Sequence, residues 1–541
     1  MKQSKKYTTK QICLLIGGLL FIIFHLYLIY IISYRLFYEL TNPINYDSIL
    51  YWVVGKGFSY GEVLYSGYYE NKPPMVFLLM SLSYNLLGNF HLSGYLCFIC
   101  LLITGFSPLV FVLIKIHKNP NCSKLGKIIS LIVAYTLGML LMLYAQNTSG
   151  SSQVENYGSA FIILYILIIA SIDSEKLKIY SPSIILASLF LMIGILFKEP
   201  FVVIALAGAI FFIRSKKDFI YKLILPFIYG GILGLLTLLL TNSIVPYFTI
   251  YIANMFSNHI NIFGSPFVRG LNWFRIYDNM FTFSPSFFFS IITLMMVTLL
   301  ILIKQNKKIF SKYNPKIITF ITIILFLLIF YLGCFTVGLG GQFYHHHYAF
   351  IIPLLISFLL FTCSYLITLP SYISIKENIK KSYLTPFSLA LVSFITISSS
   401  IGIAVLPSFS YDYLETEETI IKNANYVDKV LEVFDKKTYQ YLGFNASFYL
   451  AHTKYLPKGP IFAQDPNNFI DETSFFVTSF KKQLSEVDII IVNKILCNIL
   501  DEYVTKYLND NFTLLVDSDY NITRPESFTD LVYIRNTCLV V

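Results

Sequence analysis

Charged side chains that could do acid–base chemistry gather in the first polar stretch of the chain, directly after an apolar run. Asp47 opens this stretch, and Glu70, Lys72 and the pair Pro73-Pro74 close it. A carboxylate can act as a general base toward a hydroxyl group, and a nearby lysine can hold a phosphate as a point charge. The alternative is that Asp47 only caps a helix and that the lysine side chain extends to the lipid headgroups.

Three consecutive histidines form a second group of polar side chains. His345, His346 and His347 follow Tyr344, at the start of a later apolar run. Such histidines can contact phosphate or lipid headgroups, bind a metal ion, or serve only as interfacial polar residues. Because neighbouring side chains of an extended segment point to opposite sides, all three cannot bind one ion. The sequence leaves phosphate or headgroup contact and the interfacial role open, and ranks a metal site behind both.

Single charged residues also lie beside other apolar runs. Glu155 precedes one run, where the N-terminus of a helix would stabilise a carboxylate without any further role. Lys198 lies at the apex of a predicted helical hairpin, where its side chain could instead reach the headgroups. Arg269 lies with His259 in the loop 242–284, and its guanidinium group suits an anionic head group. Each is a weaker candidate for substrate contact than the first group.

The composition indicates where these residues act. The chain has 541 residues, of which 56% are hydrophobic and only 13% are charged. A soluble protein cannot bury that much apolar surface, so we predict a polytopic α-helical membrane protein. The net charge of +10 comes from lysines in short loops between apolar runs, which is typical of a topology signal, and no nucleic acid is expected as a partner. The sequence contains no phosphate-binding loop, so no nucleotide cofactor is expected.

Apolar runs predict about eleven membrane spans. They cover residues 11–33, 94–114, 128–145, 157–172, 182–197, 200–213, 219–241, 285–303, 317–336, 348–368 and 384–406. We interpret the further run Pro73–Leu87 as a juxtamembrane helix, because counting it as a span would place the lysine-rich loop 115–127 outside. The candidate residues then share the outer face of the membrane, in the loops 34–93, 146–156, 242–284 and 337–347 and at the apex of the hairpin.

The composition changes near Pro407. Beyond it, three short runs have the pattern of strands, at 488–492, 513–516 and 531–534, and 419–434 has helical spacing. We therefore expect two domains. Residues 1–409 form the transmembrane domain, and residues 410–541 form a small extracytoplasmic α/β domain.

Taken in order, these features resemble the GT-C class of integral-membrane glycosyltransferases, in particular bacterial protein-mannosyltransferases and aminoarabinose transferases. The resemblance covers residues 1–410. It rests on Asp47, Tyr69-Glu70-Asn71-Lys72-Pro73-Pro74, Glu155, Lys198-Glu199-Pro200 and Phe343-Tyr344-His345-His346-His347-Tyr348. Three positions depart from the pattern: Ser48 stands where relatives commonly have a second acid, Asn71 separates Glu70 from Lys72, and Glu155 stands where the acid is often Asp.

The resemblance implies a GT-C-like fold and transfer of a sugar, with inversion, from a polyprenyl-phosphate carrier to an acceptor hydroxyl. Asp47 would be the base that activates the acceptor. Lys72, with Arg269 or His345, would neutralise the departing phosphate, where negative charge develops. The further residues expected to contact the substrates are Glu70, Glu155, Lys198, Tyr344 and His347.

The resemblance also implies cofactors and partners. Members of the class differ over a divalent metal ion, and Glu70 with His259 would be its first expected ligands here. The expected partners are the polyprenyl-phosphate-linked sugar, membrane lipids, and an acceptor that is a cell-surface glycan, lipid or protein. The expected location is the cell membrane, with multiple spans.

Two other functions fit the same composition. A flippase or transporter of lipid-linked sugars would show broken helices with polar residues at mid-membrane and inverted repeats, whereas the predicted spans are nearly free of central charges. A surface polysaccharide polymerase or ligase would rely on a large, arginine-rich outer loop. The largest outer loops between the predicted spans offer only Arg35, Arg269 and Arg275.

Overall fold

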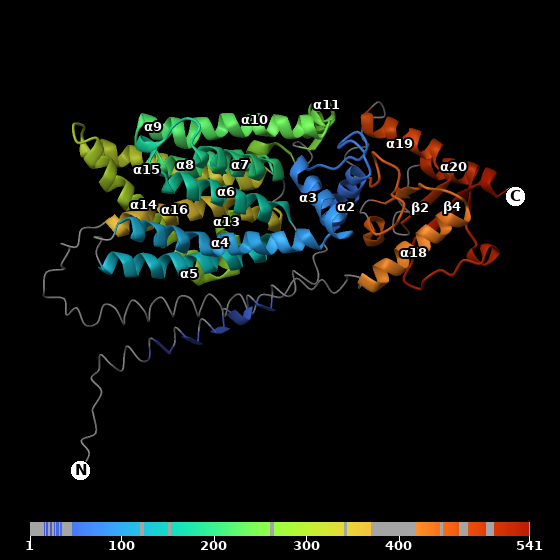
Figure 1. Cartoon of the computed structure of the whole chain (residues 1–541), viewed down its shortest axis with the longest axis horizontal. Coiled ribbons are helices and arrows are strands. Elements are labelled where there is room, and N and C mark those ends of the chain that lie inside the picture. Colours follow the sequence, from blue (N-terminus) through green and yellow to red (C-terminus); the bar gives the residue numbers. More distant parts are fainter. Residues whose placement is uncertain are drawn as a thin grey trace, which may run out of the picture. The chain divides into compact units, whose positions relative to one another are not determined.

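In the computed structural model, the described part of the chain is mostly helical and includes one small sheet (Figure 1). The structure describes residues 46–119, 124–149, 153–259, 264–339, 343–368, 417–443, 447–464, 474–493 and 502–539, together with separate residues between 16 and 34. They divide into two compact units. The first unit takes Met1–Pro43, Gly94–Gly234 and Ser265–Ser408, and the second takes Ile44–Ser93, Leu235–Gly264 and Phe409–Val541. The predicted domain division after residue 409 stays a prediction.

The first unit is built mainly from long apolar helices. The α-helices of this unit, long and short together, are α4 (His91–Lys118), α5 (Lys124–Ser149), α6 (Val154–Ser171), α7 (Pro182–Phe197), α8 (Phe201–Ala209), α9 (Lys216–Asp218), α10 (Leu225–Leu240), α12 (Pro266–Gly270), α13 (Arg275–Phe283), α14 (Pro285–Ile309), α15 (Pro315–Leu339) and α16 (Ile352–Thr368). Residues 91–93 of α4 and 235–240 of α10 fall in the second unit. A 3₁₀ helix, η6 (His345–Ile351), leads directly into α16.

Seven helical stretches among the described residues are long and apolar enough to cross a membrane. They are His91–Lys118, Gly126–Thr148, Val154–Ser171, Lys216–Leu240, Pro285–Ile309, Pro315–Gly338 and His345–Thr368. The spans predicted at 182–197 and 200–213 are also helical but shorter, at Pro182–Phe197 and Phe201–Phe212. The spans predicted at 11–33 and 384–406 lie mostly or wholly outside the described residues. The chain is a polytopic α-helical membrane protein, as its composition predicted.

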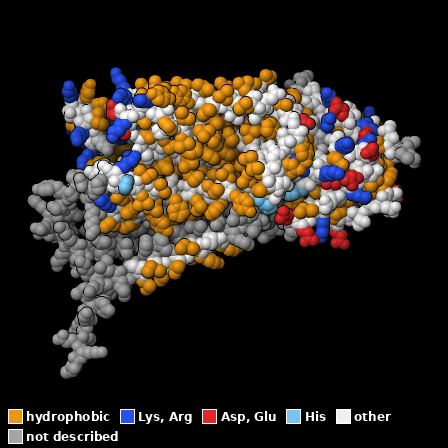
Figure 2. All heavy atoms as spheres, viewed as in Figure 1, with side chains coloured by type: hydrophobic (Ala, Val, Ile, Leu, Met, Phe, Trp, Pro, Cys, Tyr) orange, Lys and Arg blue, Asp and Glu red, His pale blue; other side chains and the backbone are white. Residues whose placement is uncertain are grey.

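The surface of the first unit fits a membrane environment. Figure 2 shows hydrophobic side chains over much of one face of this unit and a gathering of Lys and Arg at one end. The exposed apolar side chains on α10 and α15 include Ile228, Ile232, Ile321, Ile324 and Leu325. The exposed lysines near helix ends include Lys216, Lys217, Lys307 and Lys308. An apolar face beside a basic end is the pattern that the positive-inside rule describes.

Close packing holds the start of α6 against η6. The Ser159 hydroxyl on α6 donates a hydrogen bond to the backbone oxygen of Ala349, at 3.0 Å. One residue earlier, Gly158 leaves room for the ring of Phe201, because a Cβ atom there would lie 2.1 Å from that ring. The Phe201 ring in turn contacts Phe350 of η6, with 4.7 Å between ring centroids. Small residues of this kind let membrane helices approach closely.

The second unit combines two early helices with an α/β part. Its elements include α2 (Tyr46–Ser59), α3 (Pro74–Leu87), α11 (Ile244–Pro246), the π-helices η4 (Tyr247–Ile252) and η5 (Met255–His259), α18 (Glu417–Val433), α19 (Phe475–Glu486) and α20 (Glu502–Asn511). The strands are β1 (Gln440–Leu442), β2 (Ile489–Val492), β3 (Phe512–Leu514) and β4 (Leu531–Arg535), in the order β1-β2-β4-β3.

The position of each strand in the sheet is consistent with how deeply that strand is buried. β1 runs parallel to β2, with Gln440 opposite Ile490, whereas β4 runs antiparallel to both of its neighbours. All four residues of β2 are buried, while β4 alternates buried Val532 and Ile534 with partly exposed neighbours. A fully apolar central strand beside an alternating one is expected when both faces of the middle of a sheet are covered. The three strand patterns in the sequence and the helix at 419–434 are confirmed.

The second early helix, α3, has clear boundaries. Pro74 lies in its first turn, where the missing N–H needs no partner, and Gly88 ends it in the left-handed conformation at φ 69°. Its 14 residues span roughly 21 Å, less than the roughly 30 Å hydrocarbon core of a bilayer. This length fits a juxtamembrane helix better than a span.

Hydrogen bonds join α2 and the loop after it to the α/β part of the same unit. The Lys56 ammonium group donates to the backbone oxygens of Ala451 and Thr453, at 3.2 and 2.6 Å. The Tyr68 hydroxyl donates to the backbone oxygen of Pro457, at 2.7 Å. The segment that carries Asp47, Glu70 and Lys72 is therefore built into a folded unit.

Candidate active site

A buried ion pair lies at one end of the first unit. Glu155 is the second residue of α6 and is fully buried, and Lys198 follows the last residue of α7. The Lys198 ammonium group donates a hydrogen bond to Oε1 of Glu155. Helices α6 and α7 run in opposite directions along a hairpin, so the start of one meets the end of the other. Glu155 does lie in the first turn of α6, as the alternative of a helix N-terminus expected, but its carboxylate is also paired with Lys198. The Lys198 ammonium group therefore contacts Glu155 instead of extending to the headgroups.

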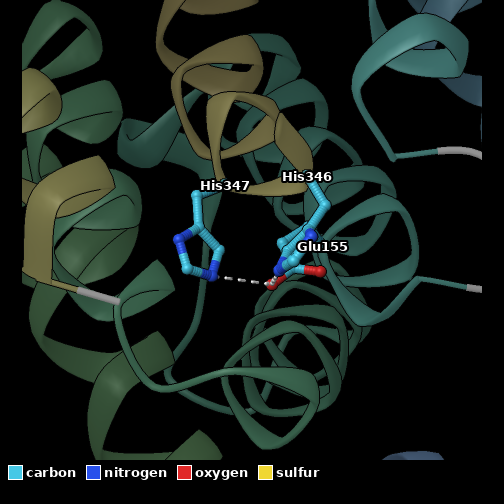
Figure 3. Close-up of side chains that lie close together, drawn as sticks. All are labelled: Glu155, His346 and His347. Carbon is cyan, nitrogen blue, oxygen red and sulfur yellow. Dashed lines mark ion pairs between the residues drawn. The ribbon is translucent and has the colours of Figure 1, made fainter. Parts of the chain in front are cut away.

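Two histidines complete this group, which we name the Glu155 cluster: Glu155, Lys198, His346 and His347. The Nε2 atoms of His346 and His347 lie 4.0 and 3.8 Å from Oε1 of Glu155, and both rings turn toward that carboxylate (Figure 3). Nε2 of His347 also lies 3.3 Å from the Lys198 ammonium group. One carboxylate therefore meets three nitrogen-bearing side chains from two other segments.

The local helix type explains why neighbouring histidines converge. The sequence argument assumed an extended segment, in which adjacent side chains point apart. The segment is instead the 3₁₀ helix η6, whose successive side chains are roughly 120° apart, so two of three neighbours can face one side. His345 is the residue that turns away, and its ring packs edge-on against Tyr348. The sequence analysis considered all three histidines, but its expected substrate contacts included only His345 and His347, not His346.

Aromatic rings frame the Glu155 cluster. The Tyr344 ring stacks on His346 with 5.8 Å between centroids, and the Lys198 ammonium group lies over the Phe350 ring at 5.5 Å. Exposure increases in one direction, from Glu155 at 0% through the His346 side chain at 25% to Tyr344 at 44%. A ligand would therefore approach the buried carboxylate from the side of Tyr344 and His346.

The donor atoms of the Glu155 cluster also suit a metal ion. One carboxylate oxygen and two imidazole nitrogens, from Glu155, His346 and His347, lie within 4.8 Å of one another. Three protein ligands of this kind with an open position are typical of catalytic zinc sites. The Lys198 ammonium group, however, already contacts both Glu155 and His347. A divalent ion would have to take the place of this ammonium group.

The second unit holds the other candidate residues. The Lys72 ammonium group lies 3.6 Å from Oε1 of Glu70, and both side chains are more than four-fifths buried. The same ammonium group lies over the Tyr51 ring, at 5.5 Å. Tyr51 comes one turn after Asp47 on α2, so the two residues lie on one face of that helix. Asp47 thus shares its side of α2 with the Glu70–Lys72 pair.

The loop around Glu70 is held in place by hydrogen bonds. The Tyr69 hydroxyl donates to the side-chain oxygen of Asn71, and the Asn254 amide donates to both, at 2.6 Å and 3.2 Å. Asn254 is only 4% exposed. It lies five residues before His259, so it holds the segment that carries His259 beside the loop that carries Glu70. The side chain of His259 lies outside the described residues, and its pairing with Glu70 as a metal site stays a prediction.

The same loop contains a strained residue. Tyr65 is fully buried and has φ 71°, a conformation that costs about 1–3 kcal/mol in a residue other than glycine. Its ring packs against Tyr251, and its hydroxyl donates to the backbone oxygen of Lys72, at 3.0 Å. Strain of this kind persists where surrounding contacts fix the backbone. Here the hydrogen bond from the Tyr65 hydroxyl holds the backbone of Lys72, the lysine predicted to bind phosphate.

Arg269 belongs to the first unit. It lies on α12 and is only 6% exposed, and burial lowers the pKa of its guanidinium group. Arginine nevertheless stays protonated in proteins, so Arg269 is a buried cation. The candidates thus form two groups. Asp47, Glu70 and Lys72 belong to the second unit, and Glu155, Lys198, Arg269, Tyr344, His345 and His347 belong to the first. That the two groups serve one site stays a prediction.

Comparison with known proteins identifies the fold. No family model matches the sequence, and no curated protein matches it. The crystal structure of ArnT from Cupriavidus metallidurans bound to undecaprenyl phosphate matches with a TM-score of 0.50, covering 94% of this chain and 97% of that one at 10% sequence identity. The same protein in the apo state matches at a TM-score of 0.48 and 11% identity, covering 94% and 96% of the two chains. The chain therefore has a GT-C-like membrane fold similar to that of ArnT, an aminoarabinose transferase, and the predicted resemblance is confirmed at the level of fold.

Proposed function

We propose that the chain is an integral-membrane glycosyltransferase that moves a sugar from a polyprenyl-phosphate carrier to an acceptor hydroxyl. One observation carries the proposal: the fold matches, over 94% of the chain, that of a transferase crystallised with undecaprenyl phosphate. The acceptor is a glycan, lipid or protein of the cell surface. Transfer takes place on the outer face of the membrane, where residues 410–541 also lie.

The proposed chemistry is a single displacement. The acceptor oxygen attacks the anomeric carbon of the donor while Asp47 takes the proton of the acceptor hydroxyl. The bond from the anomeric carbon to the phosphate oxygen breaks, and polyprenyl phosphate leaves with the bonding electrons. Because attack comes from the face opposite the leaving group, the anomeric configuration inverts. Asp47 suits this role because it lies in the first turn of α2 and is neither fully buried nor fully exposed.

Cationic groups balance the charge that develops on the phosphate. Lys72 is held by Glu70 and by the ring of Tyr51, so its ammonium group is fixed before the substrate binds. Preorganised charge of this kind stabilises a transition state without reorganisation at the moment of reaction. Arg269 and His345 are the further groups proposed for phosphate contact. A divalent cation on Glu70 and His259, where one is required, would supply additional charge neutralisation.

The Glu155 cluster is proposed to bind the hydroxyl groups of the transferred sugar. It offers a carboxylate that accepts hydrogen bonds, an ammonium group that donates them, and imidazoles that can do either. Tyr344 lies at the exposed side of this cluster, where a sugar ring would enter. Polar groups of this kind, fixed in a largely apolar surrounding, are what confers specificity on small-molecule sites.

The position of charges favours an enzyme over a flippase. In the spanning helices that the structure describes, the acidic and basic side chains lie near the helix ends, as with Lys115 and Lys118 on α4 and Lys307 and Lys308 on α14. A transporter path would place polar or ionisable groups near the middle of the bilayer. An enzyme that acts at the membrane surface needs no such groups there.

The donor class tests the proposal. Membranes that contain the full-length protein are supplied with radiolabelled sugars on polyprenyl phosphate or on nucleotides, and transfer to endogenous acceptors is measured. Membranes from cells without the protein serve as the control. We expect transfer from one or more polyprenyl-phosphate sugars only. Transfer that depends on a nucleotide sugar and persists without any polyprenyl-phosphate donor would contradict the proposal.

A further inference from the structure

A cavity of about 580 Å³ lies within the second unit, on another side of α2 from Asp47. We name it the Tyr60 cavity, and the residues that define it are Lys56, Tyr60, Tyr84, Phe90, Asn425 and Asp428. Lys56 lies nine residues after Asp47, which places the two side chains on roughly opposite faces of α2. The volume falls within the roughly 300–1,000 Å³ typical of small-molecule sites.

One wall of the Tyr60 cavity is aromatic and rigid. The hydroxyls of Tyr60 and Tyr84 are hydrogen bonded, at 2.9 Å, and the Tyr84 ring stacks on Phe90, with 5.8 Å between centroids. Phe90 stacks in turn on Trp52, at 4.5 Å and nearly parallel. Phe90 is almost fully buried, whereas Tyr60 is 53% exposed and can receive a ligand. The Tyr60 ring and the hydroxyls of Tyr60 and Tyr84 are thus held in place by the residues packed behind them.

Other residues that line the cavity are polar, and hydrogen bonds hold two of them, Lys56 and Asp428, in place. Lys56 is only 3% exposed, and its ammonium group lies over the Tyr84 ring at 5.0 Å while donating to two backbone oxygens. Asp428 accepts hydrogen bonds from the backbone N–H groups of Lys454 and Tyr455, at 2.7 and 3.3 Å. The amide of Asn425 lies on the exposed side of α18, one turn before Lys429.

The charged residues around the cavity indicate which class of ligand fits it. Three amines and two carboxylates line the cavity: Lys56, Lys429, Lys454, Asp428 and Glu432. The carboxylates disfavour an anion, and the amines disfavour a cation. His452, which also lines the cavity, is neutral at pH 7 because burial lowers its pKa to about 4. A neutral ligand with many hydroxyl groups can donate to the carboxylates and accept from the amines and amides at once.

From this geometry we propose that the Tyr60 cavity binds a neutral sugar ring. The apolar face of the ring, formed by C–H groups, packs on Tyr60, and its hydroxyls bind Asn425, Asp428 and the tyrosine hydroxyls. The proposed function gives this site a role, as an accessory contact for a glycan acceptor away from the residues that do the chemistry. That role rests on the proposed function, whereas binding of the sugar does not.

Tryptophan fluorescence can measure binding directly. The chain has two tryptophans, so the Trp273→Phe variant leaves Trp52 as the single reporter, directly behind Phe90. The full-length variant is placed in lipid nanodiscs, free of maltoside detergents, whose headgroups are themselves sugars. It is titrated with the methyl glycosides of glucose, galactose and N-acetylglucosamine, with maltose, and with inorganic phosphate.

We expect at least one neutral sugar to give a saturable change, and phosphate to give none. In the same background, Tyr60→Ala and the surface change Asn425→Arg are each expected to weaken sugar binding at least tenfold. Tyr503→Ala, an exposed tyrosine elsewhere in the unit, should leave binding unchanged. Thermal unfolding confirms that each variant is folded. The inference is overturned if a folded protein shows no saturable response to any sugar, if phosphate alone binds, or if neither cavity variant weakens binding.

The outcome separates this inference from the proposed function. Sugar binding in a protein that transfers no sugar would support the cavity and contradict the transferase proposal. Transfer of sugar by a protein whose Trp52 fluorescence shows no sugar binding would support the transferase proposal and contradict the cavity inference.

Discussion

Lys198 donates a hydrogen bond from its ammonium group to the fully buried carboxylate of Glu155. The pair joins the end of α7 to the start of α6, and both histidines that face it come from η6. Side chains from two separate segments thus converge on one carboxylate. This arrangement makes the Glu155 cluster both a structural element and a candidate substrate site, and the two roles predict different outcomes for different substitutions.

Removing one member of the buried pair should destabilise the protein. Glu155→Ala leaves the Lys198 ammonium group without its carboxylate among buried neighbours, and such changes cost about 3–5 kcal/mol. The double variant Glu155→Gln with Lys198→Met removes both charges and should be more stable than Glu155→Ala. Thermal unfolding in one detergent measures both. As a control, Lys217→Met breaks an exposed pair with Glu175 and should have a negligible effect. Equal destabilisation by Glu155→Ala and Lys217→Met would contradict this prediction.

Zinc binding tests whether the Lys198 ammonium group occupies the position that a metal ion would take in the Glu155 cluster. In Lys198→Ala the donor atoms of Glu155, His346 and His347 remain, and the competing ammonium group is gone. We expect this variant to bind Zn²⁺ more tightly than the wild type, as measured by calorimetry. Adding His346→Ala should abolish the gain, whereas adding His345→Ala should not, because the ring of His345 packs against Tyr348 instead. Identical affinities in the wild type and Lys198→Ala would show that the ammonium group does not compete.

The stability of the second unit should depend on pH through His452. Burial, and to a lesser extent the charges of Lys56 and His91, lowers the pKa of His452 from 6.5 to about 4. Between these values the unfolded chain binds a proton that the folded chain does not, so stability falls as the pH is lowered from 6.5 to 4. The shift corresponds to a loss of roughly 3 kcal/mol at most. In the Trp273→Phe background, unfolding followed by Trp52 fluorescence should depend less steeply on pH in His452→Gln. Parallel pH profiles would contradict the assignment.

The hydroxyl of Tyr65 should matter for donor binding through Lys72. Tyr65→Phe removes the hydrogen bond to the backbone oxygen of Lys72, with an expected cost of about 1 kcal/mol. Because Lys72 is proposed to hold the phosphate, KM for the donor should rise several-fold. Tyr165→Phe is the matched control, since its hydroxyl donates to the backbone oxygen of Lys222 at 2.8 Å in the first unit. Both changes should lower stability similarly. A rise in KM in both variants, or in neither, would remove this positioning role from Tyr65.

Much of the fold could be predicted from the sequence because membrane helices and buried strands carry their own apolar patterns. The strand at Ile489–Val492 and the seven long helices follow from local composition. Pairs of residues distant in the sequence could not be predicted in this way. The residues near Glu155 in the sequence do not indicate that Lys198 and His346 lie beside its carboxylate. The two adjacent histidines come together only because η6 is a 3₁₀ helix.

The same reason explains the residues that were not singled out. Lys56 resembles any lysine at the end of a helix, and only the fold shows that it is buried against residues 451 and 453. Tyr65 is one tyrosine among 41, and its positive φ is visible only in the structure. Asp47, Glu70 and Lys72 stood out because few charged residues interrupt an apolar sequence.

The most direct test of the central claim is sugar transfer by Asp47→Asn. This change keeps the size of the side chain and removes its ability to accept a proton. Transfer from the active polyprenyl-phosphate sugar is compared in the wild type, Asp47→Asn and the control Asp510→Asn, which makes the same change at an exposed position on α20. We predict that Asp47→Asn lowers kcat by about 100-fold or more, the scale of general base catalysis, with an unchanged unfolding temperature. Asp510→Asn should retain full activity. Transfer at the wild-type rate by a folded Asp47→Asn protein would contradict the role of Asp47 as the catalytic base.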